Sequence, residues 1–587
     1  MAVQELFARK GSIMASEKLF ARKATGLVRE IGFTTAVLLA ICNMVGLGWQ
    51  KRVYQVTGWA PIPESSYLAG IPPVIMSFVV VGFIVLAICV SYSAMSAAMP
   101  RSGGGYVYVS RLINPFVSYL NAHLGAFSTA ISYGQISTAV LEILVSFAGL
   151  AGIDTTAVNN PLGMFGFGFI VVIIFTLFGT FGVKMQGYLL QVMFAIPASI
   201  TVIVYGVLIA RTPEGMTAGI TQLTGVGPGA YVQGALAAGL QQAGARYSYW
   251  DAVATANIGT LWAYGGYAAA TYVAGEVKEA NRTMPRAVMT SGILVCFIYC
   301  SASFLMYRAA SSVGTGITPD YTFFGAWAYL SYGGPGVSAN TVPGLVNAYR
   351  GWLPITASFA AEGMGLGSLK ILFACFSSLW IANDIPPFLL SISRTYFAMA
   401  FDRVLPTPIA AVNRYHSPMN AVALSGVLAV VGIISEVFMG WGNIWNWPEG
   451  IYLFLANIIG ASDLWTAVYD FLVGACVIIM VYKRKDIWEK APWKGKLGIE
   501  WVGPIGILSC IGAVYLGYCF LWSPNGYNIP AIPWGDITAF GPGGSGWLVT
   551  NTLILLVIFA VIYFAMKWRA KASGIDMGTI YQEIPPE

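Results

Sequence analysis

One acidic side chain stands in the middle of a long apolar segment. Asp384 lies in LWIANDIPPFLLSISR, ten residues before Arg394. On a helix that separation is about 15 Å, half the thickness of the apolar core of a membrane. A charge at that depth is costly and therefore marks a functional candidate. Asn383, Ser377 and Ser378 offer oxygen atoms nearby, so this group of residues could bind a proton or a sodium ion.

Asp384 also has a structural interpretation. The sequence Ile-Pro-Pro follows it, and an aspartate in that position can cap a helix that restarts at Pro386. The sequence leaves both roles open, and the two roles are compatible.

Two further apolar segments carry polar or glycine interruptions. Asn43, Gly46 and Gly48 lie within FTTAVLLAICNMVGLGWQ, and Gly265 and Gly266 lie within TLWAYGGYAAATYV. Interrupted spans in corresponding positions of two halves are typical of transporters built from inverted repeats. Unwound backbone presents N–H groups to an anion and C=O groups to a cation, which suits a zwitterion such as an amino acid. The alternative is close helix packing through small residues.

Other ionisable residues in or near apolar segments are weaker site candidates. Glu142, Asp470 and His123 stand inside predicted spans. A second group lies where spans end, and its mixed charges predict salt bridges on the inner side of the membrane. This group comprises Glu276, Lys278, Arg282, Arg286, Arg394, Asp402 and Arg403.

The composition identifies the class of protein that must hold these residues. Of 587 residues, 57% are hydrophobic and only 10% are charged, against about 25% charged in soluble domains. This excludes a soluble enzyme, a nucleic-acid binder and a disordered chain. The eight cysteines stand in apolar stretches without a CxxC pair. Because the chain has no nucleophile–base constellation, metal-ligand spacing or phosphate loop, we expect no enzyme activity, cofactor or metal.

Long apolar segments predict a polytopic membrane protein. A spanning helix needs about 20 mostly apolar residues. Twelve segments qualify: about 33–50, 69–98, 116–150, 163–183, 186–210, 252–276, 288–308, 368–401, 419–438, 461–482, 500–522 and 547–566.

The distribution of positive charge predicts the orientation. With the N-terminus inside, 24 Lys and Arg residues lie on the inner side and seven on the outer side. The positive-inside rule therefore places both termini in the cytoplasm of a multi-pass cell-membrane protein. Six basic residues within 483–496 and the basic tail at 1–30 are expected to face anionic lipid headgroups.

The spans and loops divide the chain into consecutive parts. The two long outer segments, 211–251 and 309–367, are rich in Gly and could bind another protein. The predicted parts are a cytoplasmic amphipathic tail at 1–30, a first five-helix repeat at 31–210, an extracellular loop at 211–251, a second inverted repeat at 252–482 that includes the loop 309–367, a cytoplasmic loop with helices 11 and 12 at 483–566, and a cytoplasmic tail at 567–587.

Four ordered segments resemble the amino acid–polyamine–organocation (APC) superfamily of membrane permeases. They are SYSAMSAAMPRSGGGYVYVSRLINPFVSYLNAHLG (91–125), FGVKMQGYLLQV (181–192), WAYGGYAAATYVAGEVKEANRTMPRA (262–287) and SRTYFAMAFDRVLPTPIAAVNRYHSPMNAVALSG (393–426). The resemblance covers about residues 27–566. It implies an all-α LeuT-type fold with two inverted five-span repeats, broken helices 1 and 6 and two C-terminal helices, twelve transmembrane helices in all.

The resemblance also implies a binding site between spans 1, 3, 6, 8 and 10, reached by alternating access. The carboxylate of an amino acid would meet N–H groups of span 1, here at Val45, Gly46, Leu47 and Gly48. Its amino group would meet carbonyl groups of span 6, here at Trp262, Ala263 and Gly265. Trp262 also takes the place of an aromatic residue that covers the substrate from outside.

The chain departs from the family pattern at three places. Leu47 stands where relatives carry a hydroxyl that helps to bind carboxylate, and Asn43 one turn earlier is a possible substitute. Ala268 stands where several relatives carry Asp, Glu or Asn, which favours a neutral amino acid as substrate. Ala198 and Pro197 replace the lysine that many proton-coupled relatives use in span 5.

The sequence therefore supports one main function and one alternative. The main hypothesis is a secondary-active transporter of amino acids coupled to protons or another cation, with amino acid exchange as a variant. The alternative is a non-transporting subunit or sensor of the same fold in a membrane assembly, favoured by the three departures and by the two long outer segments.

Overall fold

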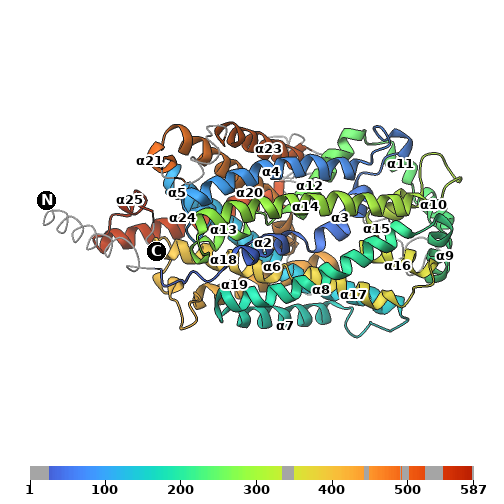
Figure 1. Ribbon diagram of the computed structural model, residues 1–587, viewed down its shortest axis with the longest axis horizontal. Coiled ribbons are helices and arrows are strands. Elements are labelled where there is room, and N and C mark those ends of the chain that lie inside the picture. Colours follow the sequence, from blue (N-terminus) through green and yellow to red (C-terminus); the bar gives the residue numbers. More distant parts are fainter. Residues whose placement is uncertain are drawn as a thin grey trace.

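The computed structural model is an elongated bundle of helices (Figure 1). It describes residues 25–333, 337, 350–441, 449–489, 491, 502–522 and 546–584. Most of the predicted tail at 1–30, part of the predicted outer loop at 309–367 and part of the predicted basic stretch at 483–496 lie outside these ranges. Within them, β pairing is limited to two isolated bridges. The all-α prediction is confirmed.

Eleven segments among the described residues are long and apolar enough to cross a membrane. They correspond to eleven of the twelve predicted spans. The predicted span at 252–276 is missing because the chain there forms two short helices, and the count of twelve therefore remains a prediction. The long helices outside the broken spans are α4 (Pro73–Ala98), α6 (Pro115–Leu150), α7 (Pro161–Gly179), α8 (Gly182–Ala210), α14 (Ala280–Ser311), α19 (Met419–Trp441), α20 (Glu449–Tyr482), α23 (Val502–Trp522) and α24 (Gly546–Ala572).

The first span is broken between α2 (Phe33–Met44) and α3 (Leu47–Trp59). Val45 and Gly46 between them leave helical geometry, with Gly46 at φ −124° and ψ −121°. A Cβ atom on Gly46 would overlap the carboxylate of Asp384. Glycine is therefore required here for the close approach of another helix.

The sixth span is broken between α12 (Tyr249–Tyr264) and α13 (Ala269–Tyr272). Gly266 in the break has φ +119°, a conformation that favours glycine. A Cβ atom there would meet the backbone of Asn43 at 2.5 Å. The two broken spans therefore touch each other at their interruptions.

The eighth span is interrupted as well. Helix α17 (Leu369–Ala382) is followed by Asn383 and Asp384, and then by α18 (Ile385–Phe401). Asp384 stands at the N-cap position of α18, but its side chain makes no capping hydrogen bond. The capping interpretation is therefore wrong for the side chain, which turns toward span 1 instead.

The predicted outer loops form short helices that pack on the bundle. The first loop holds α9 (Pro213–Thr224), α10 (Pro228–Ala237) and α11 (Leu240–Gly244), and the second holds α15 (Phe323–Tyr332) and α16 (Leu353–Gly363). Nine of the ten residues of α15 are buried. The rings of Phe324 and Trp327 lie 5.5 and 4.7 Å from that of Tyr54 on α3. The apolar side chains of α15 thus face this chain's own bundle.

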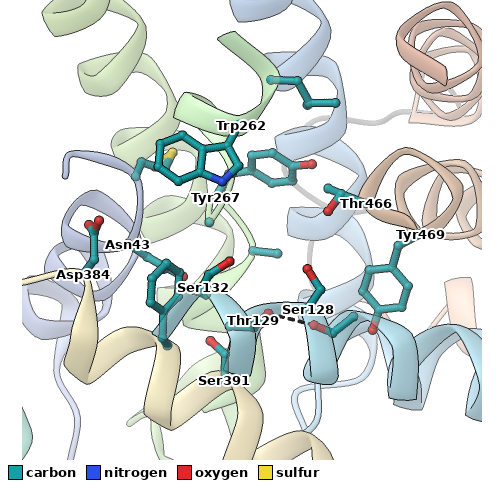
Figure 2. Close-up of a pocket in the computed structure, with 18 of the residues that line it drawn as sticks. Asn43, Ser128, Thr129, Ser132, Trp262, Tyr267, Asp384, Ser391, Thr466 and Tyr469 are labelled. Carbon is teal, nitrogen blue, oxygen red and sulfur yellow. Dashed lines mark hydrogen bonds between the residues drawn. The ribbon is translucent and has the colours of Figure 1, made fainter. Parts of the chain in front are cut away.

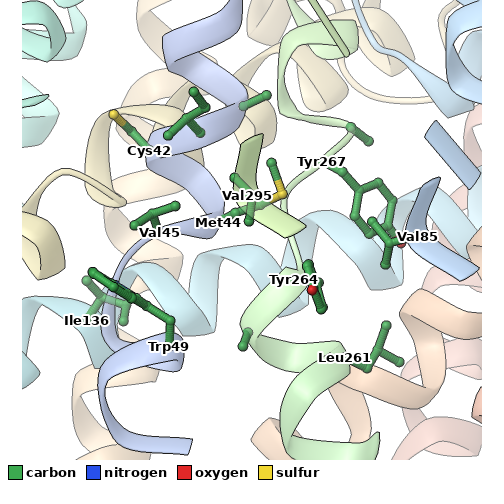
Figure 3. Packing of buried hydrophobic residues seen from close by; sticks show 14 of the residues in the cluster. Cys42, Met44, Val45, Trp49, Val85, Ile136, Leu261, Tyr264, Tyr267 and Val295 are labelled. Atoms are coloured by element: carbon green, nitrogen blue, oxygen red, sulfur yellow. The ribbon is translucent and has the colours of Figure 1, made fainter. Parts of the chain in front are cut away.

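The two ends of the bundle differ in the loops that they carry. Helices α9 and α10 lie at one end, and α5 (Gly105–Leu112), α21 (Lys485–Trp488) and α25 (Met577–Ile580) lie toward the other (Figure 1). Buried side chains from α2, α3, α4, α12 and α14 fill the centre of the bundle around the two breaks (Figure 3).

Candidate functional site

A cavity of about 140 Å³ lies where the two broken spans meet (Figure 2). A designed cavity of about 150 Å³ holds a benzene molecule, so this cavity suits a small organic ligand. Helices α4, α6, α18 and α20 complete the wall. The residues that line the cavity include Asn43, Ser128, Thr129, Ser132, Trp262, Tyr267, Asp384, Phe388, Ser391, Trp465, Tyr469 and Asp470.

The charged side chains that line this cavity are both acidic. They are Asp384 and Asp470, and no Lys, Arg or His is found among the described lining residues. Aromatic rings form much of the remaining wall. The cavity therefore offers negative charge and π faces, both of which attract an ammonium group.

Asp384 connects span 8 to the break of span 1. Its carboxylate accepts a hydrogen bond from the backbone N–H of Leu47, the first residue of α3. Its Oδ1 atom has no hydrogen-bond partner, although the residue is only 4% exposed. The amino end of α3 carries partial positive charge, and this charge stabilises the carboxylate in an apolar setting.

A second chain of contacts joins the same two spans. The Gln50 side-chain Nε2 donates to the Gly46 carbonyl at 2.9 Å, and the Ser377 hydroxyl donates to Gln50 Oε1 at 2.6 Å. Gln50 and Ser377 are fully buried. Ser377 and Asp384 thus fix span 8 to the α2–α3 break from two directions.

The two remaining ion-coupling candidates are placed differently. The Ser378 hydroxyl donates to the Ala374 carbonyl at 2.8 Å, within its own helix. Asn383 is fully buried, and neither side-chain amide atom has a hydrogen-bond partner. Asn383 is thus an unsatisfied polar group beside Asp384, whereas Ser378 turns away.

The N–H groups of the span-1 break are largely occupied by the chain itself. The Val45 N–H donates to the Ile41 carbonyl at 2.8 Å, and the Gly46 N–H donates to the Met44 carbonyl at 3.0 Å. The Leu47 N–H meets Asp384. Of the predicted span-1 residues, Asn43 and Gly48 line the cavity, and the buried Nδ2 of Asn43 has no partner.

The four predicted span-6 residues, Trp262, Ala263, Gly265 and Ala268, all line the cavity. Some of their carbonyl groups are already used. The Trp262 carbonyl accepts from the Gly265 N–H at 3.1 Å, and the Ala263 carbonyl accepts from the Tyr299 hydroxyl at 2.8 Å. The Trp262 ring lies 4.3 Å from the Arg52 guanidinium on α3, so this ring joins the two broken spans above the cavity.

The family model of amino acid permeases matches residues 31–540. The chain belongs to the amino acid permease family. An uncharacterised transporter of Mycobacterium tuberculosis is 26% identical over 75% of this chain and 80% of its own length. The general amino acid permease AGP2 of Saccharomyces cerevisiae is 24% identical over 44% of this chain and 37% of its own length. The glutamate/serine transporter AimA of Bacillus subtilis is 19% identical over 93% of this chain and 83% of its own length.

A solved structure has the same fold. The crystal structure of MhsT in complex with L-phenylalanine superimposes with a TM-score of 0.54 at 14% identity, over 85% of this chain and 99% of that protein. The LeuT-type fold of this permease is confirmed. The protein is thus an integral multi-pass membrane transporter rather than an enzyme.

The cavity of this permease includes residues that sequence reasoning ranked low or missed. Asp470 on α20 accepts hydrogen bonds from the hydroxyls of Tyr267 and Tyr92, the latter at 3.5 Å. In the sequence, only the position of Asp470 inside an apolar span indicates a role in the site. Ser128 and Ser132 on α6 also line the wall. Their spacing of four residues puts both on one helix face, but this spacing occurs in many packed helices.

Two buried ion pairs lie toward the end of this permease that carries α5 and α25. Arg394 on α18 binds Glu276 through two hydrogen bonds of 2.8 and 2.9 Å. Arg111 on α5 binds Asp402 through two bonds of 2.6 and 2.9 Å. The sequence placed Glu276, Arg394 and Asp402 in inner salt bridges but did not identify these partners. Glu142 lies toward the opposite end, 3.2 Å from Lys51.

Proposed function

We propose that this permease is a secondary-active transporter that moves neutral amino acids across the cell membrane by alternating access, coupled to protons or another cation. The observation that carries this proposal is the small cavity at the two helix breaks, with one buried acid fixed to span 1. Two relatives are named as carriers of amino acids, which supports the substrate class.

The lining favours a substrate with a positive amino group and an uncharged side chain. Asp470 and the carbonyl groups of span 6 supply negative partners for an ammonium group. Ala268 contributes only a methyl group, and Trp262, Phe388 and Trp465 offer apolar surface to a side chain. A second cationic group on the substrate would find no dedicated acid at Ala268.

Asp384 is the proposed coupling residue. An ionised carboxylate inside a membrane span is costly unless it is compensated. It is compensated here by one N–H group at the amino end of α3. A proton or a sodium ion at the unpaired Oδ1 would neutralise it, with Ser377 and Asn383 close by.

Alternating access requires contacts that close each end of the cavity in turn. The Arg52–Trp262 contact is a candidate for the outer closure, and the Glu276–Arg394 pair for the inner closure. We further propose the orientation with both termini in the cytoplasm. The inner face then carries most of the Lys and Arg residues.

Uptake into proteoliposomes tests the function directly. Purified permease is reconstituted and given a panel of radiolabelled amino acids under an imposed proton or sodium gradient. We expect uptake of neutral amino acids to follow one gradient and to lose that dependence in Asp384→Asn. Asp486→Asn makes the same change at an exposed residue outside the spans and serves as the matched control.

The other outcomes separate the alternatives. Uptake that requires a second amino acid inside the vesicles, and no ion gradient, would identify an exchanger. Gradient-driven uptake that persists unchanged in Asp384→Asn would reject Asp384 as the coupling residue. Folded native protein that takes up none of the panel would reject the proposal and favour a non-transporting subunit or sensor.

A further inference from the structure

The amino end of α3 is the place where the resemblance puts the carboxylate of a substrate, and a carboxylate of this protein already lies there. Asp384 accepts the N–H of Leu47, and its carboxylate approaches Gly46 so closely that a Cβ atom would overlap it. The N–H groups of Val45 and Gly46 pair with the preceding turn. In the span-1 break, the Asp384 carboxylate therefore occupies the N–H group of Leu47 at the amino end of α3.

Two buried polar atoms without hydrogen-bond partners indicate that this place is a ligand site and not only a contact between helices. Oδ1 of Asp384 and Nδ2 of Asn43 are buried without hydrogen-bond partners, and their residues are 4% and 6% exposed. Both residues line the cavity, on the side of the span-1 break (Figure 2). Buried groups of this kind are normally satisfied, so both atoms are available to bind a ligand in the cavity.

The surroundings of Asp384 disfavour a second negative charge at this helix end. Among the described residues, Cys42 on α2 and Tyr299 on α14 are ionisable groups that interact with Asp384, and neither is a cation. A second carboxylate beside Asp384 would add like-charge repulsion in a medium of low dielectric constant. Asp384 and a substrate carboxylate that reaches the N–H group of Leu47 therefore compete for that group.

We propose that Asp384 is an internal substitute for the substrate carboxylate, holding the amino end of α3 when the cavity is empty and yielding it to the substrate during transport. The proposal rests on the proposed function and deepens it. Once displaced, Asp384 loses the dipole that compensates its charge. It then needs the coupling cation, so substrate binding and cation binding become linked at one residue.

Equilibrium binding to purified permease tests this competition. The probes are two matched pairs that differ by the carboxylate: L-phenylalanine with phenethylamine, and L-leucine with isoamylamine. A charged acceptor binds an N–H group roughly twice as strongly as a neutral acceptor does. Asp384→Asn should therefore raise the affinity for the amino acids by about tenfold, with unchanged or weaker binding of the amines.

The other acid of the cavity provides the control. Asp470 is bound by two tyrosine hydroxyls, away from α3. Asp470→Asn should shift the affinities for amino acid and amine in the same direction, leaving their ratio unchanged. A ratio that does not rise in Asp384→Asn, or that rises equally in both variants, overturns the competition.

The native chain keeps the proposal testable if the variant does not fold. An infrared difference spectrum on adding L-phenylalanine, compared with the same amino acid carrying a ¹³C carboxylate, separates substrate bands from protein bands. A protein carboxyl band that persists with the labelled substrate is expected. Bound substrate with no such band overturns the displacement and leaves the transport proposal standing, whereas failure of all four probes to bind rejects both proposals.

Discussion

At the scale of single residues, the site depends on how closely Asp384 approaches the span-1 backbone. Gly46 is the residue that permits this approach, because any side chain there would overlap the carboxylate. The sequence identified Gly46 and Asp384 separately, each from its position in an apolar span. It could not show that they touch, because the contact joins residues more than 300 positions apart.

Gly46→Ala should therefore displace Asp384 and weaken both folding and transport. Overpacking of this kind costs about 1–3 kcal/mol, which we expect as a lower melting temperature in detergent together with loss of gradient-driven uptake. Gly517→Ala on α23 is the matched control, since a Cβ atom there meets nothing within 4 Å. It should be neutral or stabilising by up to about 1 kcal/mol. Equal behaviour of the two variants would contradict the importance of this contact.

At the scale of helices, the sequence predicted which segments are spans better than it predicted how they end. Apolar runs identified eleven spans because twenty consecutive apolar residues have few other structures available. The segment at 252–276 is also mostly apolar, yet it forms α12 and α13 with four residues between them. Its break depends on Gly266 meeting Asn43, a tertiary contact that hydropathy does not report.

At the amino end of α18, too, a tertiary contact decides where a polar side chain lies. The local sequence allowed Asp384 to be a cap because Pro386 and Pro387 follow it, yet the side chain makes no cap hydrogen bond. The first turn of α18 needs few caps, because prolines have no N–H group to satisfy. The carboxylate is therefore available to α3, whose free N–H group is the stronger electrostatic partner.

The Glu276–Arg394 pair links α18 to the segment that follows the broken sixth span. Both side chains are at most 1% exposed and are joined by two hydrogen bonds. Glu276→Gln leaves the Arg394 charge buried without its counter-ion and should cost about 3–5 kcal/mol. The measurement is thermal unfolding of the purified permease.

An exposed pair gives the comparison for this substitution. Asp486 binds Arg484 with similar geometry, but their side chains are 58% and 38% exposed. Asp486→Asn should cost less than about 1 kcal/mol, because water screens the interaction. If both variants melt alike, the buried pair does not stabilise this conformation.

At the scale of the whole molecule, the C-terminal segment closes back on the bundle. The sequence predicted a cytoplasmic tail from residue 567 and indicated no partner for it. In the structure, Met577, Ile580 and Tyr581 are buried, and the Tyr581 ring lies 5.1 Å from the Arg111 guanidinium. This ring covers the Arg111–Asp402 pair, to which Tyr106 also donates a hydrogen bond of 3.0 Å. The C-terminal segment therefore covers a buried ion pair of the bundle.

Replacing the Tyr581 ring should destabilise the Arg111–Asp402 pair that it covers. Tyr581→Ala removes a buried aromatic side chain and a cation–π contact with Arg111. We expect a loss of about 3–5 kcal/mol, the usual cost of truncating a buried aromatic residue, measured as a lower melting temperature. Trp568→Ala on α24 removes an even larger aromatic side chain from a residue that is 75% exposed, and it should change the melting temperature little. If Tyr581→Ala and Trp568→Ala are equally mild, the C-terminal segment does not stabilise the Arg111–Asp402 pair.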